Sequence, residues 1–501
     1  MSIIKNLIAG SWEESAETFI TPLGTFSSAN KVAVDRALIA AKESFQAFAE
    51  TTTQERANFL KDLIHCLAAN KDEIIAAYTA ESQLPAARAD GEFGRTIGQI
   101  LRFVELLEEG NYLQPIIESK EGTADLRKMN HPTGPIAVFG ASNFPLAFST
   151  AGGDSISAFA AGCPVIVKSH PYHPYTSFKV ASAIHQAVMN SGLPAGIFSH
   201  LQAEGHELGQ DLVLHPLLKG VGFTGSFKGG KALYDMAQQR PEPIPVFAEM
   251  GSVNPMVILP HALANKEDLA KQLVDSITLG SGQFCTNPGL IIALGSAHER
   301  AVFEEALIRC IQTKEKQPMV HQSILTQFES KLNQHQKELK VVGGVPAAMG
   351  FTIATAFLKN LHWAEEVFGP YSLFIGCEQL TEVEAILNSL DGQLTLSLIG
   401  DDKDHKDVAR LLPLAQEKAG RILFEGVPTG VAVTQSMMHG GPFPASTDNR
   451  FSAVGTDAIF RWLRPIAYQD CPDALLPPAL QKKNPLHLSR VVNGVLTKES
   501  Q

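Results

Sequence analysis

The chain of 501 residues lacks the features that mark several classes of protein. Positive charge is in deficit, because 41 lysines and arginines face 52 aspartates and glutamates and leave a formal net charge of −11. A nucleic-acid-binding protein usually has a clear excess of positive charge, although local basic pockets are compatible with this balance. Charged residues make up 19% and hydrophobic residues 45% of the chain, as in an ordinary globular protein. We therefore expect small-molecule partners and no nucleic acid.

Cysteine is also scarce, and its six copies are scattered without a Cys-x-x-Cys pair. Such spacing gives no disulfide framework and suits a reducing cytosol. Residues 1–12 contain a short apolar run but no signal-peptide pattern. A cytoplasmic location is therefore expected. The histidines form no His-Glu-x-x-His or other compact ligand pattern, so no metal is expected. The absence of a Walker A sequence leaves an ATPase with little support.

Long uninterrupted apolar runs are missing as well. Residues 132–167 carry a single charge, Asp154, and at first sight resemble a transmembrane segment. Asn143, Pro145 and Pro164 interrupt the run, however, and favour a buried strand, loop, helix and strand. The sequence therefore predicts no membrane span.

The pattern of apolar residues predicts an α/β protein of two or three domains. Three helical stretches occupy most of the first hundred residues, at 32–50, 54–81 and 94–108. A polar, alternating stretch at 116–129 predicts strands that leave the main body. Short β-branched runs separated by helical segments then indicate a mostly parallel sheet with right-handed crossovers. The strands expected in this sheet are 136–140, 164–169, 198–203, 220–225 and 245–250.

A second α/β stretch follows, from residue 256 to about residue 455. Its expected strands are 256–259, 290–294, 371–376, 394–400 and 420–424. After residue 459 the chain is rich in proline and ends in an alternating run that predicts one strand at 486–495. The carboxyl ends of parallel strands gather ligands. We therefore expect the loops 141–145, 168–171 and 225–229 to share one site.

Cys285 lies in a stretch of small and turn-forming residues, 280–289, directly after an expected helix. A free cysteine is usually a small buried apolar residue. Glycines, however, let a ligand approach the backbone, and local amides lower a thiol pKa and bind an oxyanion. This setting favours a reactive thiol. On these residues alone, protease, transferase and redox chemistry all stay open.

A phosphate-binding turn is indicated more weakly. Residues 222–229 follow an expected strand and begin a helix, but their spacing is Gly-x-x-Gly-x-x-x-Gly. The usual dinucleotide fingerprint is Gly-x-Gly-x-x-Gly. A simple helix cap by Ser226 explains the same residues equally well.

Six short motifs together are much more specific. In chain order they are Ala-Ser-Asn143-Phe-Pro, Val-Ile-Val-Lys168, Phe-Thr-Gly225-Ser226, Ala-Glu249-Met-Gly, Gly-Gln-Phe-Cys285 and Glu365-Glu366-Val-Phe368-Gly-Pro. Their order and spacing resemble those of the aldehyde dehydrogenase superfamily over almost the full chain. Residues 168–174 and 439–445 resemble the branch of 2-oxoglutarate semialdehyde (2,5-dioxopentanoate) dehydrogenases and NADP-dependent fatty aldehyde dehydrogenases.

The resemblance implies a role for each central residue. Cys285 attacks the aldehyde as a thiolate, and the Asn143 side-chain amide and the Cys285 N–H stabilise the oxyanion. Glu249 activates the water that hydrolyses the resulting thioester, which disfavours transfer to coenzyme A or phosphate. His439 resembles a histidine that the fatty-aldehyde branch places near the nucleophile, although a lone histidine is more often structural. Without the resemblance, Asn143 is an ordinary turn residue and Glu249 a solvated or capping carboxylate.

The resemblance also implies a nicotinamide cofactor. Lys168 reaches the adenosine ribose, and Glu366 binds the nicotinamide ribose. The other expected cofactor residues are Ser169, His170, Gly225, Ser226, Gly229 and Phe368. Where many NAD-preferring relatives have a glutamate, three residues after this lysine, the chain has Pro171. No carboxylate there repels a 2′-phosphate, so we expect NADP to be preferred, with NAD as the alternative.

The expected architecture is an aldehyde dehydrogenase fold in three parts. Residues 1–110 and 132–250 form a Rossmann-type cofactor domain, 251–458 an α/β catalytic domain, and 111–131 with 459–501 a small β element for oligomerisation. Open strand edges in that element imply a homodimer or homotetramer. The expected substrate is 2,5-dioxopentanoate, oxidised to 2-oxoglutarate. The alternatives are long-chain aliphatic aldehydes, or an inactive dehydrogenase-like binding or structural protein. An arginine for the substrate carboxylate has three candidates on the sequence: Arg450, Arg461 and Arg464.

Overall fold

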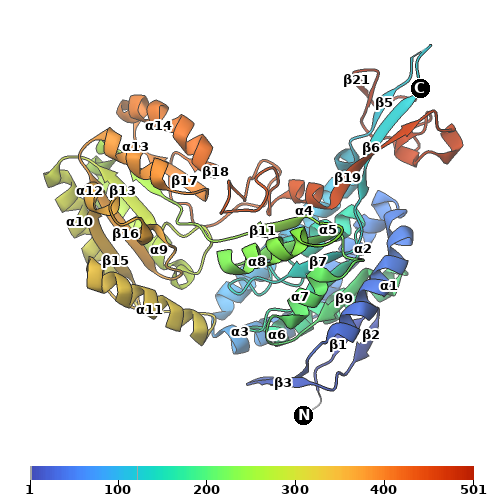
Figure 1. The fold of residues 1–501 in the computed structure, drawn as a ribbon, viewed down its shortest axis with the longest axis horizontal. Helices are drawn as coiled ribbons and strands as arrows, with labels where there is room; N and C mark the ends of the chain where they lie inside the picture. The colour runs from blue at the N-terminus through green and yellow to red at the C-terminus, as the bar shows by residue number, and fades with distance from the viewer. Residues whose placement is uncertain (1–2, 121, 501) are drawn as a thin grey trace.

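The protein is described here by a computed structural model that places residues 3–120 and 122–500. Two large sheets form two lobes, and a third sheet projects from the lobe that contains the N-terminal half of the chain (Figure 1). Helices cover both faces of each large sheet, as expected where parallel strands are buried on both sides. The fold is therefore α/β, as the sequence predicts. No helix within the described residues is long and apolar enough to cross a membrane.

The α-helices lie between Lys31 and Lys418. In chain order they are α1 Lys31–Ala49, α2 Thr53–Ala69, α3 Lys71–Ser82, α4 Ala86–Glu109, α5 Gly153–Ala161, α6 Pro174–Ser191, α7 Glu207–Leu214, α8 Phe227–Gln238, α9 Lys266–Thr278, α10 Ala297–Gln312, α11 Gln322–Glu338, α12 Ala354–Phe357, α13 Leu380–Ser389 and α14 His405–Lys418.

The first sheet has the order β11-β10-β7-β8-β9-β1-β2. Five strands are parallel, and β1 and β2 extend the sheet as an antiparallel edge. Their bounds are β1 Asn6–Ile8, β2 Ser11–Glu13, β7 Ile136–Phe139, β8 Val165–Lys168, β9 Phe198–Leu201, β10 Gly220–Thr224 and β11 Val246–Glu249. The carboxyl ends of β7, β8 and β10 lead into the loops expected to share a site.

The second sheet has the order β14-β15-β16-β13-β12-β17-β18 and is parallel except at the β14 edge. Its strands are β12 Met256–Ile258, β13 Leu290–Leu294, β14 Lys340–Gly343, β15 Ala348–Ile353, β16 Tyr371–Cys377, β17 Gln393–Ile399 and β18 Ala419–Leu423. Two hydrophobic clusters pack on its opposite faces, with Leu290 in one and Ile291 in the other. This alternation is the period-two pattern of a strand buried on both sides.

The third sheet has the order β19-β6-β5-β20-β21. It joins two distant parts of the chain: β5 Ile116–Glu118 and β6 Leu126–Pro132 with β19 Leu463–Gln469, β20 Arg490–Val492 and β21 Val495–Thr497. A separate hairpin is formed by β3 Thr18–Thr21 and β4 Gly24–Ser27.

Three local predictions were wrong. Residues 54–81 form two helices, α2 and α3, because the chain turns at Asn70, whose side chain donates to the Cys66 carbonyl. The final strand, expected at 486–495, is a short hairpin around Asn493 and Gly494, which both have positive φ. Such a pair favours the tight turn of a hairpin. Strands β1 to β4 were also missed, because each has at most four residues and little periodicity.

The edge strand β11 connects the first sheet to the second lobe. Its outer edge pairs with residues 445–447: Met250 donates its N–H to the Ala445 carbonyl over 2.8 Å, and Thr447 donates to the Ala248 carbonyl over 3.1 Å. A few residues earlier, the same segment lies against the second sheet, where a Cβ on Gly441 would be 2.1 Å from the Gln393 carbonyl oxygen. Residues 439–447 therefore fix β11 relative to the second lobe.

Candidate active site

The loop that carries Cys285 has a backbone that few residues other than glycine adopt. Gly280, Ser281 and Gly282 have φ angles of 54°, 56° and 65°, in the left-handed region. At Gly282 a Cβ would lie 2.2 Å from the Gly369 carbonyl oxygen. Only glycine therefore lets this loop approach the Glu366–Gly369 segment.

Side-chain amides hold the loop in place. Asn254 donates to the Cys285 carbonyl over 2.8 Å and to the Asn287 carbonyl over 2.9 Å. From the first sheet, the Asn143 side-chain amide donates to the Gln283 carbonyl over 3.0 Å. Asn143 thus contacts the loop that carries Cys285, the residue with which it was expected to form an oxyanion site.

Glu92, on α4, supports the Asn143 loop and was not predicted from the sequence. Its buried carboxylate accepts N–H donors from Leu146 and Ala147, at 2.8 and 3.0 Å, and the Tyr78 hydroxyl at 2.7 Å. Burial raises the pKa of this carboxyl, against the effect of nearby Arg88. The only sequence signal was an acidic residue among apolar residues on one face of a helix.

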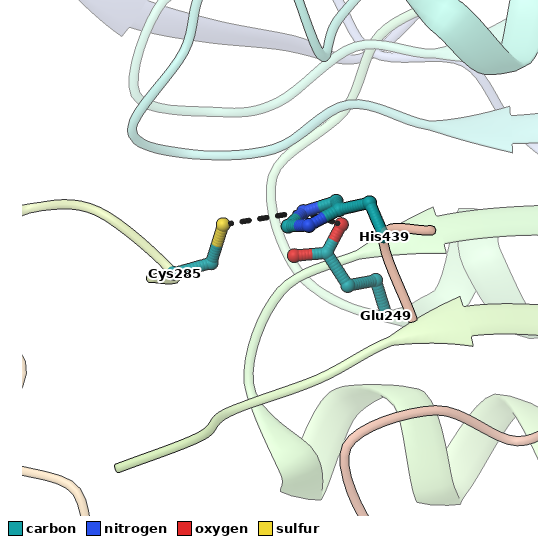
Figure 2. Close-up of side chains that lie close together, drawn as sticks. All are labelled: Glu249, Cys285 and His439. Atoms are coloured by element: carbon teal, nitrogen blue, oxygen red, sulfur yellow. Dashed lines mark hydrogen bonds and ion pairs between the residues drawn. The ribbon is translucent and has the colours of Figure 1, made fainter. Parts of the chain in front are cut away.

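Cys285, His439 and Glu249 form the centre of the site. Figure 2 shows the thiol pointing at the imidazole ring, with the Glu249 carboxylate beside the same ring. The His439 Nε2 atom lies 3.5 Å from the Cys285 Sγ and 2.9 Å from the Glu249 Oε2. Neither Glu249 oxygen has a hydrogen-bond partner among the described residues. The His439 Nε2 therefore lies within reach of both the sulfur and the carboxylate, and its contact with the carboxylate is an ion pair only when the ring is protonated.

The surroundings oppose ionisation of the thiol. Burial raises the pKa of Cys285 well above its usual value, and the charges of Glu249 and Glu366 raise it further. Desolvation and like charge both penalise a thiolate. These surroundings therefore favour the protonated thiol over the thiolate.

The three central side chains also resemble the donor set of a metal site. One ligand atom from each of Glu249, Cys285 and His439 lies within 4.8 Å of the others. Sulfur, imidazole and carboxylate are all zinc ligands. The absence of a metal therefore stays a prediction.

Lys168 ends β8 in a nearly buried position. Within the described residues its ammonium has no acidic partner, and burial alone lowers its pKa to about 8. A buried, unpaired cation fits an anionic or hydroxyl-bearing ligand. The adjacent Ser169 is fully buried, and the His170 Nδ1 accepts the Tyr172 N–H over 3.1 Å, so His170 also has a local turn-forming role.

The turn after β10 has a structural explanation in this fold. The Ser226 hydroxyl accepts the Gly229 N–H over 3.2 Å and caps α8. A Cβ on Gly225 or Gly229 would lie within 2.9 Å of the Phe223 ring beneath the turn. Ser226 therefore caps α8, as the alternative interpretation of this turn expected. The free N–H groups at the start of α8 remain suited to a phosphate.

Glu366 and Phe368 line a cavity next to the Cys285 loop, together with Ser252 and Phe284. The Glu366 carboxylate packs against Gly251, where a Cβ would lie 2.4 Å from Oε2. Burial raises the pKa of Glu366 to about 7, although the Ser252 N–H opposes this. The cavity thus presents the Glu366 carboxyl group against Gly251, which follows the β11 strand end by two residues.

Comparison with known proteins agrees with this geometry. The sequence profile of the Aldehyde dehydrogenase family matches residues 19–441. The chain is 44% identical over 488 residues to alpha-ketoglutaric semialdehyde dehydrogenase 2 of Azospirillum brasilense, covering 94% of this chain and 93% of the relative. It is 43% identical over 495 residues to alpha-ketoglutaric semialdehyde dehydrogenase of Acinetobacter baylyi, with the same coverage.

Solved structures share the fold at lower identity. A 1-pyrroline-5-carboxylate dehydrogenase from Thermus with bound NAD has a TM-score of 0.80 at 20% identity, covering 93% of this chain and 92% of that one. A 3,6-anhydro-L-galactose dehydrogenase in complex with NAP also has a TM-score of 0.80, at 19% identity, covering 93% and 100%. With its profile match and its two relatives above 40% identity, the chain belongs to the aldehyde dehydrogenase family.

Proposed function

We propose that this enzyme oxidises 2,5-dioxopentanoate, which is alpha-ketoglutaric semialdehyde, to 2-oxoglutarate with NADP. The observation that carries the proposal is the contact of Cys285, His439 and Glu249 in a chain 44% identical to an enzyme named for that aldehyde. Long-chain aliphatic aldehydes are the alternative substrates. An inactive binding protein is disfavoured, because the side chains that the reaction needs are all present and lie together.

The first step is attack of Cys285 on the aldehyde carbon. The thiol donates its proton to the His439 Nε2, which lies 3.5 Å away. The adjacent Glu249 carboxylate stabilises the resulting imidazolium over 2.9 Å. Sulfur then bonds to carbon and forms a thiohemiacetal. The developing oxyanion accepts hydrogen bonds from the Asn143 amide and the Cys285 N–H, a type of interaction whose loss typically costs about 10²–10³-fold in rate.

Residues on the first sheet and in the Glu366 cavity would hold the cofactor. Lys168, Ser169 and His170 would hold the adenosine end. The start of α8, with Gly225, Ser226 and Gly229, would hold the phosphates. Glu366 and Phe368 would hold the nicotinamide ribose. Burial is the cause of the lowered pKa of Lys168, and no carboxylate raises it. Together with Pro171 in place of a glutamate, this supports NADP as the proposed cofactor. The chemistry that it supplies when bound is acceptance of a hydride, which turns the thiohemiacetal into a thioester.

Glu249 completes the cycle. Its two carboxylate oxygens are buried without hydrogen-bond partners in the described structure, which leaves them free to orient a water molecule. Glu249 removes a proton from that water, the oxygen attacks the thioester carbon, and the Cys285 thiolate leaves with release of the carboxylic acid. Water is thus the acyl acceptor, and coenzyme A is not needed.

We also propose the three-part division of the chain given above, with the third sheet as an oligomerisation element. Its edge strand β21 exposes Val495 and Leu496, at 66% and 72% of their surface. An open edge with apolar side chains favours pairing with a second copy. The six free cysteines support a reducing, cytoplasmic environment.

The substrate and cofactor can be tested together by steady-state kinetics. We expect kcat/KM for 2,5-dioxopentanoate to exceed that for dodecanal by at least about tenfold, which corresponds to about 1.4 kcal/mol of transition-state binding. NADP should support a kcat/KM at least equal to that with NAD. A clear preference for the neutral long-chain aldehyde would select the alternative substrate.

Glu249→Gln should stop the reaction at the thioester. Because the amide cannot remove a proton from water, we expect one rapid turnover of NADPH formation and then a slow steady state. Intact mass should show one acyl group on the protein, absent from the Cys285→Ala control. Unchanged steady-state turnover of Glu249→Gln would contradict the assigned base.

The oligomer can be tested by light scattering of the full chain. We expect the mass of a dimer or tetramer of the 54.0 kDa chain. The double substitution of Val495 and Leu496 by lysine should lower that mass by placing like charges at a strand edge. A wild-type monomer would refute the proposed role of the third sheet.

A further inference from the structure

The three arginines considered for the substrate carboxylate lie in other environments. Arg450 is exposed and forms an ion pair with Asp448 over 2.6 Å. Arg461 is buried against Asp154 at 2.8 Å. Arg464 lies on β19, opposite a residue of β6 in the third sheet. None of the three is placed to meet a substrate at Cys285.

Two other arginines converge on one segment beside the catalytic centre. Arg95, on α4, donates from Nη1 to the Val431 carbonyl. Arg421, on β18, donates from Nη1 to the Gly430 carbonyl over 3.0 Å and from Nη2 to the Pro428 carbonyl. Helix α4 and strand β18 thus present a cation each to residues 428–431, from opposite lobes of the molecule.

Neither guanidinium has an ion-pair partner within the described residues. Arg88, two turns before Arg95 on the same helix, differs because it lies 4.0 Å from Glu92. The Arg421 Nε is buried and has no hydrogen-bond partner. Partly buried cations without counter-ions are costly to fold, and a bound anion would remove that cost.

The two arginines are electrostatically coupled to the reaction centre. Burial lowers the pKa of Arg95 and of Arg421, and in both cases the largest opposing influence is that of Cys285 in its ionised form. The Arg95 guanidinium lies 5.7 Å from the centre of the Phe148 ring, and that ring lies 6.2 Å from the His439 ring. Phe148 therefore separates Arg95 from the histidine that contacts the thiol.

We propose that Arg95 and Arg421 form a carboxylate-binding subsite for aldehydes that carry a carboxylate at the far end of a short chain. Arg95 donates directly to that carboxylate. Arg421 positions residues 428–431 through its carbonyl contacts and adds a second positive charge. This subsite deepens the function proposed above and rests on it. A long aliphatic tail would instead place apolar carbon against these cations, which disfavours the fatty-aldehyde alternative.

The test compares aldehydes of one chain length with and without the carboxylate. We expect Arg95→Met to lower the ratio of kcat/KM for 5-oxopentanoate to that for pentanal by roughly 10- to 100-fold, the range of a charge-assisted hydrogen bond. The loss should appear mainly as weaker binding of the carboxylated aldehyde, with a raised KM and little change in kcat. Arg95→Lys should recover part of the ratio because the charge is kept. Arg102→Met, an exposed change on the same helix, is the matched control and should leave the ratio unchanged.

Equal losses for both aldehydes in Arg95→Met would overturn the subsite, because they would indicate a structural role. A wild-type enzyme without preference for 5-oxopentanoate over pentanal would overturn it as well. The proposed substrate, 2,5-dioxopentanoate, is tested independently of the subsite. It would be contradicted if the wild type preferred another carboxylated aldehyde. In that case the ratio measured with 5-oxopentanoate and pentanal still decides the role of Arg95.

Discussion

The catalysis that we propose depends on a thiol that must lose its proton in a place that disfavours a thiolate. Burial and two nearby carboxylates, Glu249 and Glu366, raise the pKa of Cys285. The His439 Nε2 lies 3.5 Å from the sulfur. In the proposed mechanism, nucleophilic attack is therefore coupled to proton transfer onto the imidazole. In the proposed last step the same environment makes the Cys285 thiolate a poor leaving group, so the proton held by His439 would have to return to the sulfur as the thioester is cleaved.

This contact exists only because three distant segments are held together. Glu249 ends β11, His439 lies in the segment that pairs with β11, and Cys285 lies in a loop of the second lobe. Glycines permit the close approaches, at Gly282 against Gly369 and at Gly441 against Gln393. Asn143 then joins the first sheet to the Cys285 loop. The catalytic geometry is thus a property of the junction between two lobes, with both sheets contributing strand ends and loops.

Much of the fold was predictable, because its strands are short β-branched runs separated by helices and their carboxyl ends converge. The terminal hairpin and the strands β1 to β4 were not, since such short elements form through pairing and carry little periodicity. For the site, small and turn-forming neighbours marked Cys285 as unusual, and only resemblance linked it to Glu249 and His439. Glu92 and Arg95 were missed, because a helical charge looks the same in sequence whether it faces solvent or a loop from another lobe. Only the packing of α4 in the folded structure shows which of its charged side chains face solvent and which face a loop.

The most direct test of this proton transfer measures the reactivity of Cys285 without any substrate. The rate of its alkylation by iodoacetamide at pH 7, followed by peptide mass spectrometry, reports the readiness with which the thiol gives up its proton. We predict that His439→Asn alkylates at least about tenfold more slowly than wild type, equivalent to a pKa about one unit higher. Half-buried Cys310 should react equally in both proteins. Equal alkylation of Cys285 with and without His439 would contradict the coupling of attack to this histidine.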